Sequence, residues 1–417
     1  MGQVRIAAIA AALCMLGMRS VPAAAWSFSA AQGNRSAPSP SPTATLPATG
    51  ASSLPSASPT SAPHRTAQPL PRSAIQPSAS PAPTLAPDRI RQIDTLAARE
   101  LASRHLPGMS LAIARNGTVV YANGYGYRNL ESRLGADPAT VYEIGAVTEQ
   151  FTAAGILLLA QDGKLSIDDR LSKYIPDFPH ASDVTLRNLL AHTSGIHSYT
   201  ATAEYKRRQL DQVTAAEILA TVRNAPLDFA PGTRFAPSPT DYILLGLVIE
   251  KVSAESYGEF LYDRFVKSLS LNATAYNGSA TQSPEFATGY AYTNGRLRPA
   301  TPIDLAWGYS AAGLVSTALD LAAWDAALEN GKVLAAGARA SLFGRTVLAD
   351  GTPLGYGFGV NGISVDGRPA FEERGSRPGF SVQNMTFPAD RLSVVIMTNG
   401  DGFDGSPLAK RIFSLAR

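Results

Sequence analysis

The chain has 417 residues, of which 45% are hydrophobic, so it is long enough to bury a large core. The formal net charge is +3 at pH 7, but residues 1–87 contain five Arg and no Asp, Glu or Lys, which leaves −2 for residues 88–417. We find no basic stretch with interleaved aromatic residues in the sequence. We therefore expect no nucleic-acid partner.

The first 25 residues have the pattern of a secretory signal peptide. Arg5 precedes an apolar run over 6–18, and the small residues at 23–25 offer a cleavage site after Ala25. This run is shorter than the roughly 20 residues that a membrane-spanning helix needs. We therefore expect a secreted or periplasmic protein with no transmembrane segment after removal of the signal.

Residues 26–87 are predicted to form a disordered linker. They are dominated by Ser, Pro, Ala and Thr, and they include too few large apolar residues to fold. Such a segment is extended, and it serves either as a stalk that crosses cell-wall polymer or carries O-linked sugars, or as a plain spacer. The only cysteine, Cys14, lies within the signal, so the mature chain has no disulfide and no thiol ligand or nucleophile.

The folded domain is expected over 88–417 and opens with an amphipathic helix over 88–105. Two β-type runs follow at 109–114 and 119–124, joined by Asn116-Gly117, which is a strong hairpin signal. Ser316 and Thr317 are interpreted as the cap of a later helix. The other expected elements are helices over 151–161, 213–222, 242–252 and 407–416, and β-type runs over 355–359 and 392–397.

Several motifs occur in order along this domain. Gly145 is followed by Ala146-Val147-Thr148-Glu149-Gln150-Phe151-Thr152, and residues 184–196 are VTLRNLLAHTSGI. These segments resemble the nucleophile helix and the LLxHTSG segment of the serine β-lactamase and penicillin-binding-protein superfamily, in its class C β-lactamase, esterase and D-aminopeptidase branch. Further matches are PGTRF at 231–235, AAGLVSTALDLA at 311–322 and GSRPGF at 375–380.

The resemblance covers residues 88–417. It implies a serine β-lactamase-like fold of the α/β (α+β) class, with an antiparallel sheet built from the two ends of the domain and flanked by helices. A mostly helical region from about 148 to 300 is inserted between the two parts of the sheet. The resemblance also implies that the active-site cleft lies where the two regions meet.

The side chains that perform acyl transfer in this superfamily are replaced here. The family pattern is Ser-x-x-Lys, in which the Ser attacks an acyl carbon and a nearby Lys or Tyr takes its proton. Ala146 stands at the Ser position and Glu149 at the Lys position. Pro237 and Pro239 stand where the family has Tyr-x-Asn, and they supply neither a hydroxyl nor a carboxamide. Glu373 stands at the basic residue of the third motif, His/Lys-x-Gly.

The backbone part of the site is expected to survive. Gly375 of the third motif is kept, and by resemblance the oxyanion donors are the NH groups of Ala146 and Ser376. Loss of the nucleophile alone lowers the rate of a comparable serine hydrolase by roughly a million-fold. We interpret the sequence as a kept scaffold whose catalytic side chains are gone.

Glu149 and Glu373 are expected to face the same cleft, which then carries acidic groups where the family has cations. One hypothesis is a site that prefers amino-bearing ligands, with the two carboxyl groups sharing a proton. The alternative is that Glu373 pairs with Arg374 or Arg377, or that both acids are solvated. No His accompanies the two acids in their motifs, so we expect neither a metal nor a cofactor.

Three functions remain open at this stage. The first is an exported, catalytically inactive protein that binds a ligand or partner, such as a cell-wall peptide, an amino compound or another wall enzyme. The second is an active esterase, peptidase or β-lactamase with Ser194 or Ser238 as the nucleophile. The third is a stalked interaction module with a vestigial cleft. His192 is interpreted as a hydrogen-bonded buried side chain, with a role as base to Ser194 as the alternative.

Overall fold

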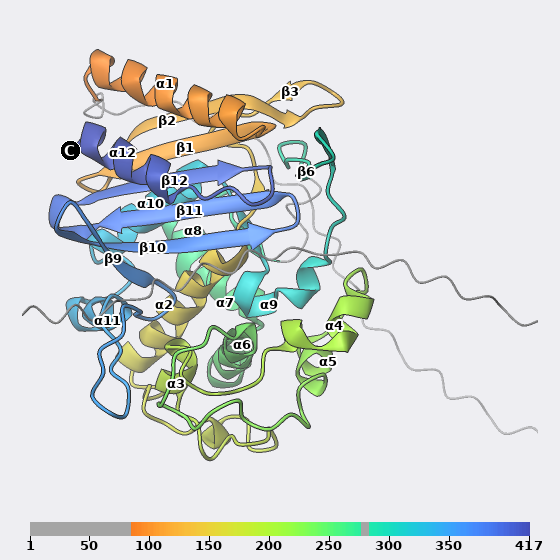
Figure 1. The fold of residues 1–417 in the computed structure, drawn as a ribbon. Helices are drawn as coiled ribbons and strands as arrows, with labels where there is room; N and C mark the ends of the chain where they lie inside the picture. Colours follow the sequence, from red (N-terminus) through yellow and green to blue (C-terminus); the bar gives the residue numbers. More distant parts are fainter. Residues whose placement is uncertain (1–84, 277–282) are drawn as a thin grey trace, which may run out of the picture. The chain divides into compact units, whose positions relative to one another are not determined.

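The computed structural model describes residues 85–276 and 283–417 (Figure 1). The predicted signal peptide and almost all of the predicted linker therefore lie outside the described residues. Pro87, the last residue of the expected linker, is already the first residue of helix α1 (Pro87–Ser103). None of the described helices combines the length and the apolar content that a bilayer-spanning helix requires.

The centre of the domain is a seven-stranded sheet in which all neighbouring strands run antiparallel. The strand order is β3-β2-β1-β12-β11-β10-β9, so the two ends of the domain meet in the middle of the sheet. The register of β1 with β12 runs from Met109 opposite Thr398 to Arg115 opposite Leu392. The strands are β1 (Gly108–Arg115), β2 (Thr118–Asn129), β3 (Leu134–Gly135), β9 (Asn361–Val365), β10 (Arg368–Arg377), β11 (Phe380–Phe387) and β12 (Leu392–Thr398).

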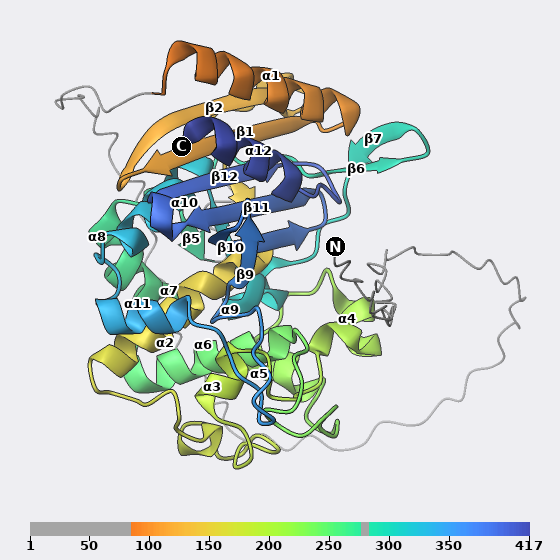
Figure 2. The same cartoon turned by 60° about the vertical axis from the view of Figure 1, so that its left-hand side comes forward.

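Helices cover both faces of this sheet. Helices α1 and α12 (Ser406–Ala416) lie side by side on one face, and α10 (Ala318–Glu329) lies on the other (Figures 1 and 2). Alternate side chains of β1 point to opposite faces of the sheet, as the pleat of a strand requires. Leu111 and Ile113 join the core under α1 and α12, whereas Ala112 and Ala114 join the larger core that contains α10.

Two apolar helices form the centre of the larger core. Helices α2 (Thr148–Gln161) and α6 (Pro239–Ser253) pack against each other, and most of their residues are buried. A helix that is apolar on nearly all sides has to be buried in this way. The other helices are α3 (Leu186–Leu190), α4 (Ala203–Arg208), α5 (Ala215–Ala220), α7 (Tyr257–Leu261), α8 (Lys267–Leu269), α9 (Tyr309–Ala312) and α11 (Ala336–Leu342).

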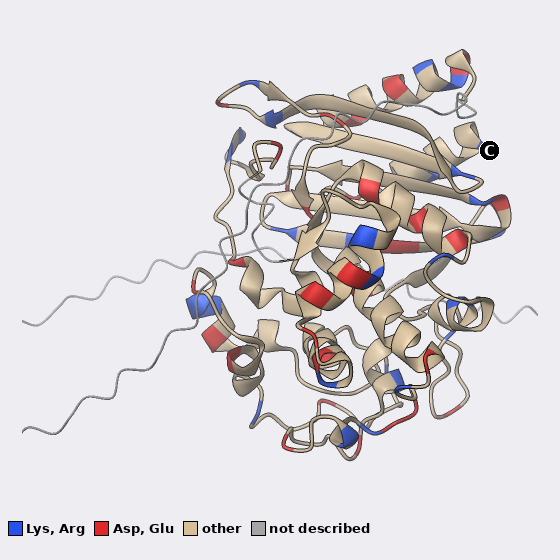
Figure 3. Cartoon of the chain, turned by 180° about the vertical axis from the view of Figure 1, so that it is seen from behind, with Lys and Arg blue, Asp and Glu red and all other residues tan. Residues whose placement is uncertain are grey.

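Shorter elements complete the domain. Strands β4 (Tyr142–Glu143), β8 (Leu314–Ser316) and β5 (Ala275–Tyr276) form a small sheet, and β6 (Tyr290–Thr293) pairs with β7 (Arg296–Pro299). The single turns of 3-10 or π helix are η1 (Gly145–Val147), η2 (Leu171–Lys173), η3 (Tyr199–Ala201), η4 (Tyr262–Val266), η5 (Leu305–Trp307) and η6 (Pro388–Asp390). Acidic and basic residues are interspersed over these elements (Figure 3).

The predicted fold class is confirmed, and two details are corrected. The inserted region is longer than expected, because the main sheet stops at Gly135 and resumes only at Asn361, so α9, α10 and α11 belong to the insertion. The β-type run expected over 355–359 is a turn instead. Gly359 has φ +68°, which only a glycine adopts without strain, and the Gly357 NH donates to the Val360 carbonyl within this turn.

Candidate functional site

The site is built around the start of α2. Ala146 lies in η1, immediately before α2, and its side chain is partly exposed. Glu149 lies in the first turn of α2 and is 5% exposed. An acid is favoured in the first turn of a helix because the unsatisfied NH groups there carry partial positive charge.

Two glycines allow η1 to pack directly against β10. Gly145 has φ +52°, and a Cβ atom added to it would lie 2.6 Å from the Ser376 nitrogen. A Cβ atom added to Gly375 would lie 1.8 Å from the Ile144 carbonyl oxygen. The backbones of η1 and β10 are therefore in contact, which brings the segments that carry the two expected oxyanion donors, Ala146 and Ser376, together.

Behind Ala146 the side chains form a buried chain of acid, histidine and acid. His192 Nε2 lies 3.2 Å from Glu149 Oε2, and His192 Nδ1 lies 3.1 Å from Asp241 Oδ2. The histidine is 2% exposed and Asp241 is fully buried. His192 lies in the turn after α3, Glu149 in the first turn of α2 and Asp241 in the first turn of α6. The contacts among these three side chains therefore link the two central helices, α2 and α6.

The geometry at His192 follows from local signals in the sequence. Thr185 caps α3 in a capping box with Asn188, and α3 ends at Leu190 with Ala191 as its C-cap. His192 then adopts φ +53°, which is sparsely populated for residues other than glycine. This turn places the imidazole beside the rings of Tyr242 and Tyr356, with centroid distances of 5.1 and 5.4 Å.

The charges in this buried chain are coupled. Burial lowers the pKa of His192, but the charge of Glu149 and the hydrogen bond with Asp241 outweigh it and raise the pKa to about 10. Burial raises the pKa of Asp241 to about 6, although its hydrogen bond with His192 opposes this shift. The protonated form of His192 is therefore favoured at neutral pH, with a carboxylate within hydrogen-bond distance of each ring nitrogen.

The two serines considered as nucleophiles have other environments. Ser194 Oγ donates to Asp241 Oδ1 at 2.5 Å and accepts from the Ile196 NH at 2.9 Å, and the residue is 1% exposed. Ser194 thus contacts His192 only through Asp241. Ser238 is 5% exposed, and its Oγ has no hydrogen-bond partner among the described residues.

The segment with the two prolines borders the same histidine. Ser238 precedes α6, Pro239 is the first residue of that helix, and the Ser238 nitrogen lies 3.3 Å from His192 Nδ1. A proline fits this position because the first NH groups of a helix have no intrahelical partner. Pro237 is exposed and Pro239 is half-buried.

Glu373 lies on β10, opposite Asn384 of β11, and is half-buried. Burial and the nearby charge of Glu149 hold the pKa of its carboxyl group well above the usual range. The predicted alternative, in which Glu373 pairs with Arg374 or Arg377, is wrong. Arg374 pairs with Glu372 at 3.0 Å, and Arg377 pairs with Glu143 at 2.8 Å.

The sequence analysis missed three participants. Asp241 is the one that the sequence could have indicated, because it is an acid in the first turn of an apolar helix, and a buried charge requires a partner. Tyr242 and Tyr356 had no motif of their own. The other alternative, that both acids are solvated, is also wrong for Glu149, which is buried against His192.

No metal site accompanies these residues in the described part of the chain, where no three His, Cys, Asp or Glu side chains are arranged to hold an ion.

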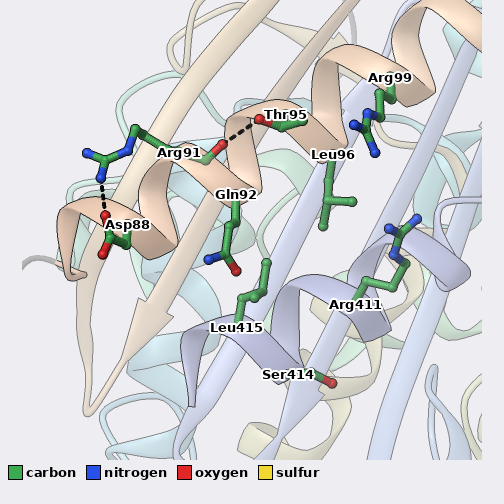
Figure 4. A pocket seen from close by; sticks show the side chains of 9 residues that line it. All are labelled: Asp88, Arg91, Gln92, Thr95, Leu96, Arg99, Arg411, Ser414 and Leu415. Carbon is green, nitrogen blue, oxygen red and sulfur yellow. Dashed lines mark hydrogen bonds and ion pairs between the residues drawn. The ribbon is translucent and has the colours of Figure 1, made fainter.

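A groove of about 570 Å³ lies elsewhere, between α1 and α12 (Figure 4). Arg91, Arg99 and Arg411 line it, and Arg91 is hydrogen-bonded to Asp88. This groove is on the sheet face opposite the larger core and is not part of the site.

The family assignment rests on comparison with known proteins as well as on this geometry. A family model described as Beta-lactamase matches residues 93–417, which is most of the chain. The chain therefore belongs to this family, and the predicted resemblance of the chain to the β-lactamase and penicillin-binding-protein superfamily is confirmed. The correspondence of single positions to the family's catalytic side chains stays a prediction.

Individual relatives differ in how much of the chain they match. Protein flp of Staphylococcus aureus (strain MW2) is 33% identical over 245 residues, 57% of this chain and 48% of that protein. The chain thus spans about half the length of these curated relatives. Putative penicillin-binding protein PbpX of Bacillus subtilis (strain 168) is 26% identical over 74% of this chain and 75% of its own length.

Solved structures agree on the fold. The octameric penicillin-binding protein homologue from Pyrococcus abyssi has a TM-score of 0.71 and 29% identity, and the match covers 78% of this chain and 77% of that one. The D-amino acid amidase from Ochrobactrum anthropi SV3 has a TM-score of 0.70 over 79% of this chain and 98% of that one. Its identity of 20% supports the fold alone.

Proposed function

We propose that this chain is an exported family member that has lost acyl transfer and binds a ligand at the retained site. The proposal is supported by the methyl group of Ala146 at the predicted position of the nucleophile and by the contact of Glu149 with His192 immediately behind it. A methyl group has no lone pair with which to attack an acyl carbon. A carboxylate engaged by an imidazolium cannot replace an ammonium group.

The alternative serine nucleophiles find little support in the geometry. His192 has a pKa of about 10, so at neutral pH it already holds the proton that a general base must accept. The Ser194 hydroxyl donates to Asp241 and is buried. Activity through either serine would require the buried side chains of Glu149, His192 and Asp241 to rearrange.

The ligand class that fits this site is a small acyl compound with a free amino group, such as a cell-wall peptide. The backbone NH groups of Ala146 and Ser376 suit a carbonyl or carboxylate oxygen. Glu373 suits an ammonium group, because an ammonium favours the ionised carboxylate and offsets the burial that raises the pKa of this carboxyl group. Binding should therefore lower the pKa of Glu373.

Titration calorimetry with the dipeptide D-alanyl-D-alanine and its N-acetyl form tests this proposal. We expect the free amine to bind at least about tenfold more tightly, since a charge-assisted hydrogen bond contributes about 1.5–3 kcal/mol. Glu373→Gln should abolish that preference, and Glu204→Gln, which removes the same charge from the exposed surface of α4, should leave it intact. Equal affinity for the two peptides in the native chain would rule out the amine site.

Export is the second part of the proposal and rests on the sequence of residues 1–87. The expected cleavage after Ala25 gives a mature chain that begins at Trp26. Mass spectrometry of the protein from the culture medium or periplasm of a bacterial host tests this directly. An intact N-terminus in the cytoplasmic fraction would contradict it.

A further inference from the structure

A separate cavity with both polar and apolar lining lies beside α10, on the sheet face opposite α1 and α12. Its volume is about 290 Å³, and its walls come from α2, α10, α11, β11 and the turn after β11, which lie near one another in Figure 2. Its polar lining includes Asp325, Glu329, Thr386, Arg339 and Arg391. None of these residues belongs to the site around His192.

Two carboxyl groups in this cavity have unused oxygens. Asp325 is 1% exposed, and its Oδ1 accepts from Asn384 Nδ2 at 2.9 Å, but its Oδ2 is buried without a partner. Glu329 lies one helical turn further on the same face of α10, and its Oε1 is also buried without a partner. Among residues 85–276 and 283–417, neither carboxyl group forms an ion pair.

The sheet adds further unused groups beneath α10. Thr386 is 6% exposed, lines the cavity and has a buried Oγ1 without a partner. Ser393 lies directly opposite Thr386 in the β11–β12 register, and its hydroxyl lies close enough to Asp325 to lower the pKa of that carboxyl group. Buried polar atoms in folded proteins are nearly always hydrogen-bonded, so the unpartnered oxygens of Glu329 and Thr386 beside Asp325 need an explanation.

Cationic and apolar residues occupy other parts of the cavity wall. Arg339 Nη1 donates to the carbonyl oxygens of Leu328 and Glu329, and Arg391 Nη2 donates to Asn330 Oδ1. A guanidinium has five N–H donors, so both retain donors for an anion. Leu328, Phe343 and Pro388 supply an apolar surface next to them.

We propose that this cavity binds a small zwitterion with an apolar side chain, the chemical class of an α-amino acid. Its ammonium group would donate to Asp325 Oδ2, Glu329 Oε1 and Thr386 Oγ1. Its carboxylate would accept from Arg339 and Arg391, and its apolar group would contact Phe343. A bare metal ion fits less well, because two carboxylates are few ligands and the volume is several times that of one water molecule.

The titration of Asp325 and Glu329 agrees with this assignment. Burial raises the pKa of Asp325 to about 8, and burial raises that of Glu329 to about 7 although Arg391 and Arg339 oppose the shift. Neither carboxyl group forms an ion pair among the described residues, and the two arginines do not overcome the effect of burial on Glu329. An incoming ammonium supplies a cation, so the affinity should rise between pH 6 and pH 8 (about these values) as protons leave.

Titration calorimetry of the full chain with leucine, in D and L forms, tests the proposal. Two analogues with one charge each serve as probes, namely 3-methylbutylamine and 4-methylpentanoate. We expect saturable binding of at least one leucine enantiomer and at least about tenfold weaker binding of both analogues. Glu329→Gln should weaken the binding of both leucine and the amine. Arg391→Gln should weaken the binding of leucine and leave that of the amine unchanged.

Controls separate this cavity from the site around His192. Glu204→Gln, on the exposed surface of α4, should leave leucine binding unchanged, and leucine binding should not compete with that of D-alanyl-D-alanine. Asp325→Asn is the stronger test of the buried carboxylate, and the half-buried Glu329 keeps the proposal testable if that variant does not fold. Absence of saturable binding by leucine of either hand, or unchanged affinity in both Glu329→Gln and Arg391→Gln, would overturn the proposal.

Discussion

His192 Nε2 lies 3.2 Å from Glu149 Oε2, inside a core where both side chains are almost completely buried. The histidine of the LLAHTSG segment thus neutralises the acid that stands at the predicted lysine position of the nucleophile helix. The substitution at 149 is therefore not an isolated change. The positive charge of His192 compensates for the acid at 149, although burial alone would disfavour that charge.

Glu149→Gln should destabilise the domain. The amide can still accept one hydrogen bond from His192, but it leaves the buried imidazolium with Asp241 as its only counterion. We expect the free energy of unfolding to fall by about 1–3 kcal/mol. Urea denaturation measures it, with Glu204→Gln as the matched control, since that glutamate also lies in a first helical turn and pairs only at the surface. The control should change stability by no more than about 0.5 kcal/mol.

Stability should depend on pH through His192. Its pKa is raised to about 10, while the ordinary value is 6.5, so the folded state holds this proton more tightly than the unfolded state. The stabilisation is complete below about pH 6.5 and is lost as the pH rises toward about 10. Glu149→Gln removes the charge that contributes most to raising the pKa of His192. In this variant the stabilisation should therefore be lost at a lower pH. Superimposable pH profiles for the two proteins between about pH 6 and 9.5 would contradict the charge assignment.

Gly375→Ala should disturb the contact between β10 and η1. The added Cβ would lie 1.8 Å from the Ile144 carbonyl oxygen, which belongs to backbone and cannot move aside easily. We expect a loss of at least about 1–3 kcal/mol in the free energy of unfolding. Gly337→Ala in α11 is the control, because a Cβ there meets nothing within 4 Å, and it should gain about 0.5–1 kcal/mol. Equal effects of the two substitutions would show that the close approach is not required.

The family motifs predicted the fold because they consist of residues that packing and backbone geometry demand. The glycines at 145 and 375, the caps of α3 and α10 and the apolar faces of α2 and α6 all serve local geometry. Thr317 caps α10 as expected, whereas Ser316 belongs to β8 and hydrogen-bonds Thr274. Such features are visible in one sequence because each depends on neighbouring residues.

The electrostatics of the site was harder to predict because it depends on contacts between distant segments. Glu149 and Asp241 are far apart in the sequence and meet only through the turn at His192. The expected pair of Glu149 and Glu373 captured the acidity of the site but omitted Asp241 and the cation, His192, that lies between Glu149 and Asp241. Predicting which charged side chains pair in a buried network requires the three-dimensional arrangement of these segments.

Ala146→Ser combined with Glu149→Lys should restore acylation. The NH groups of Ala146 and Ser376 are untouched, and the introduced ammonium has Asp241 and Glu373 nearby. Loss of the Glu149 charge also lowers the pKa of His192 and limits repulsion. We expect labelling by a fluorescent penicillin in the double variant and none in Ala146→Ser alone, which lacks a base. Labelling of neither variant would mean that the site has changed beyond these two side chains.

The most direct test of the account is the unmodified protein itself. Purified chain should be incubated with a fluorescent penicillin and with a broad ester substrate, and then examined by intact-mass spectrometry and by product release. We predict no covalent adduct and no hydrolysis above the rate in buffer, because the predicted position of the nucleophile, Ala146, carries a methyl group. A stoichiometric adduct on any serine, or ester turnover well above that of buffer, would contradict the claim that acyl transfer has been lost.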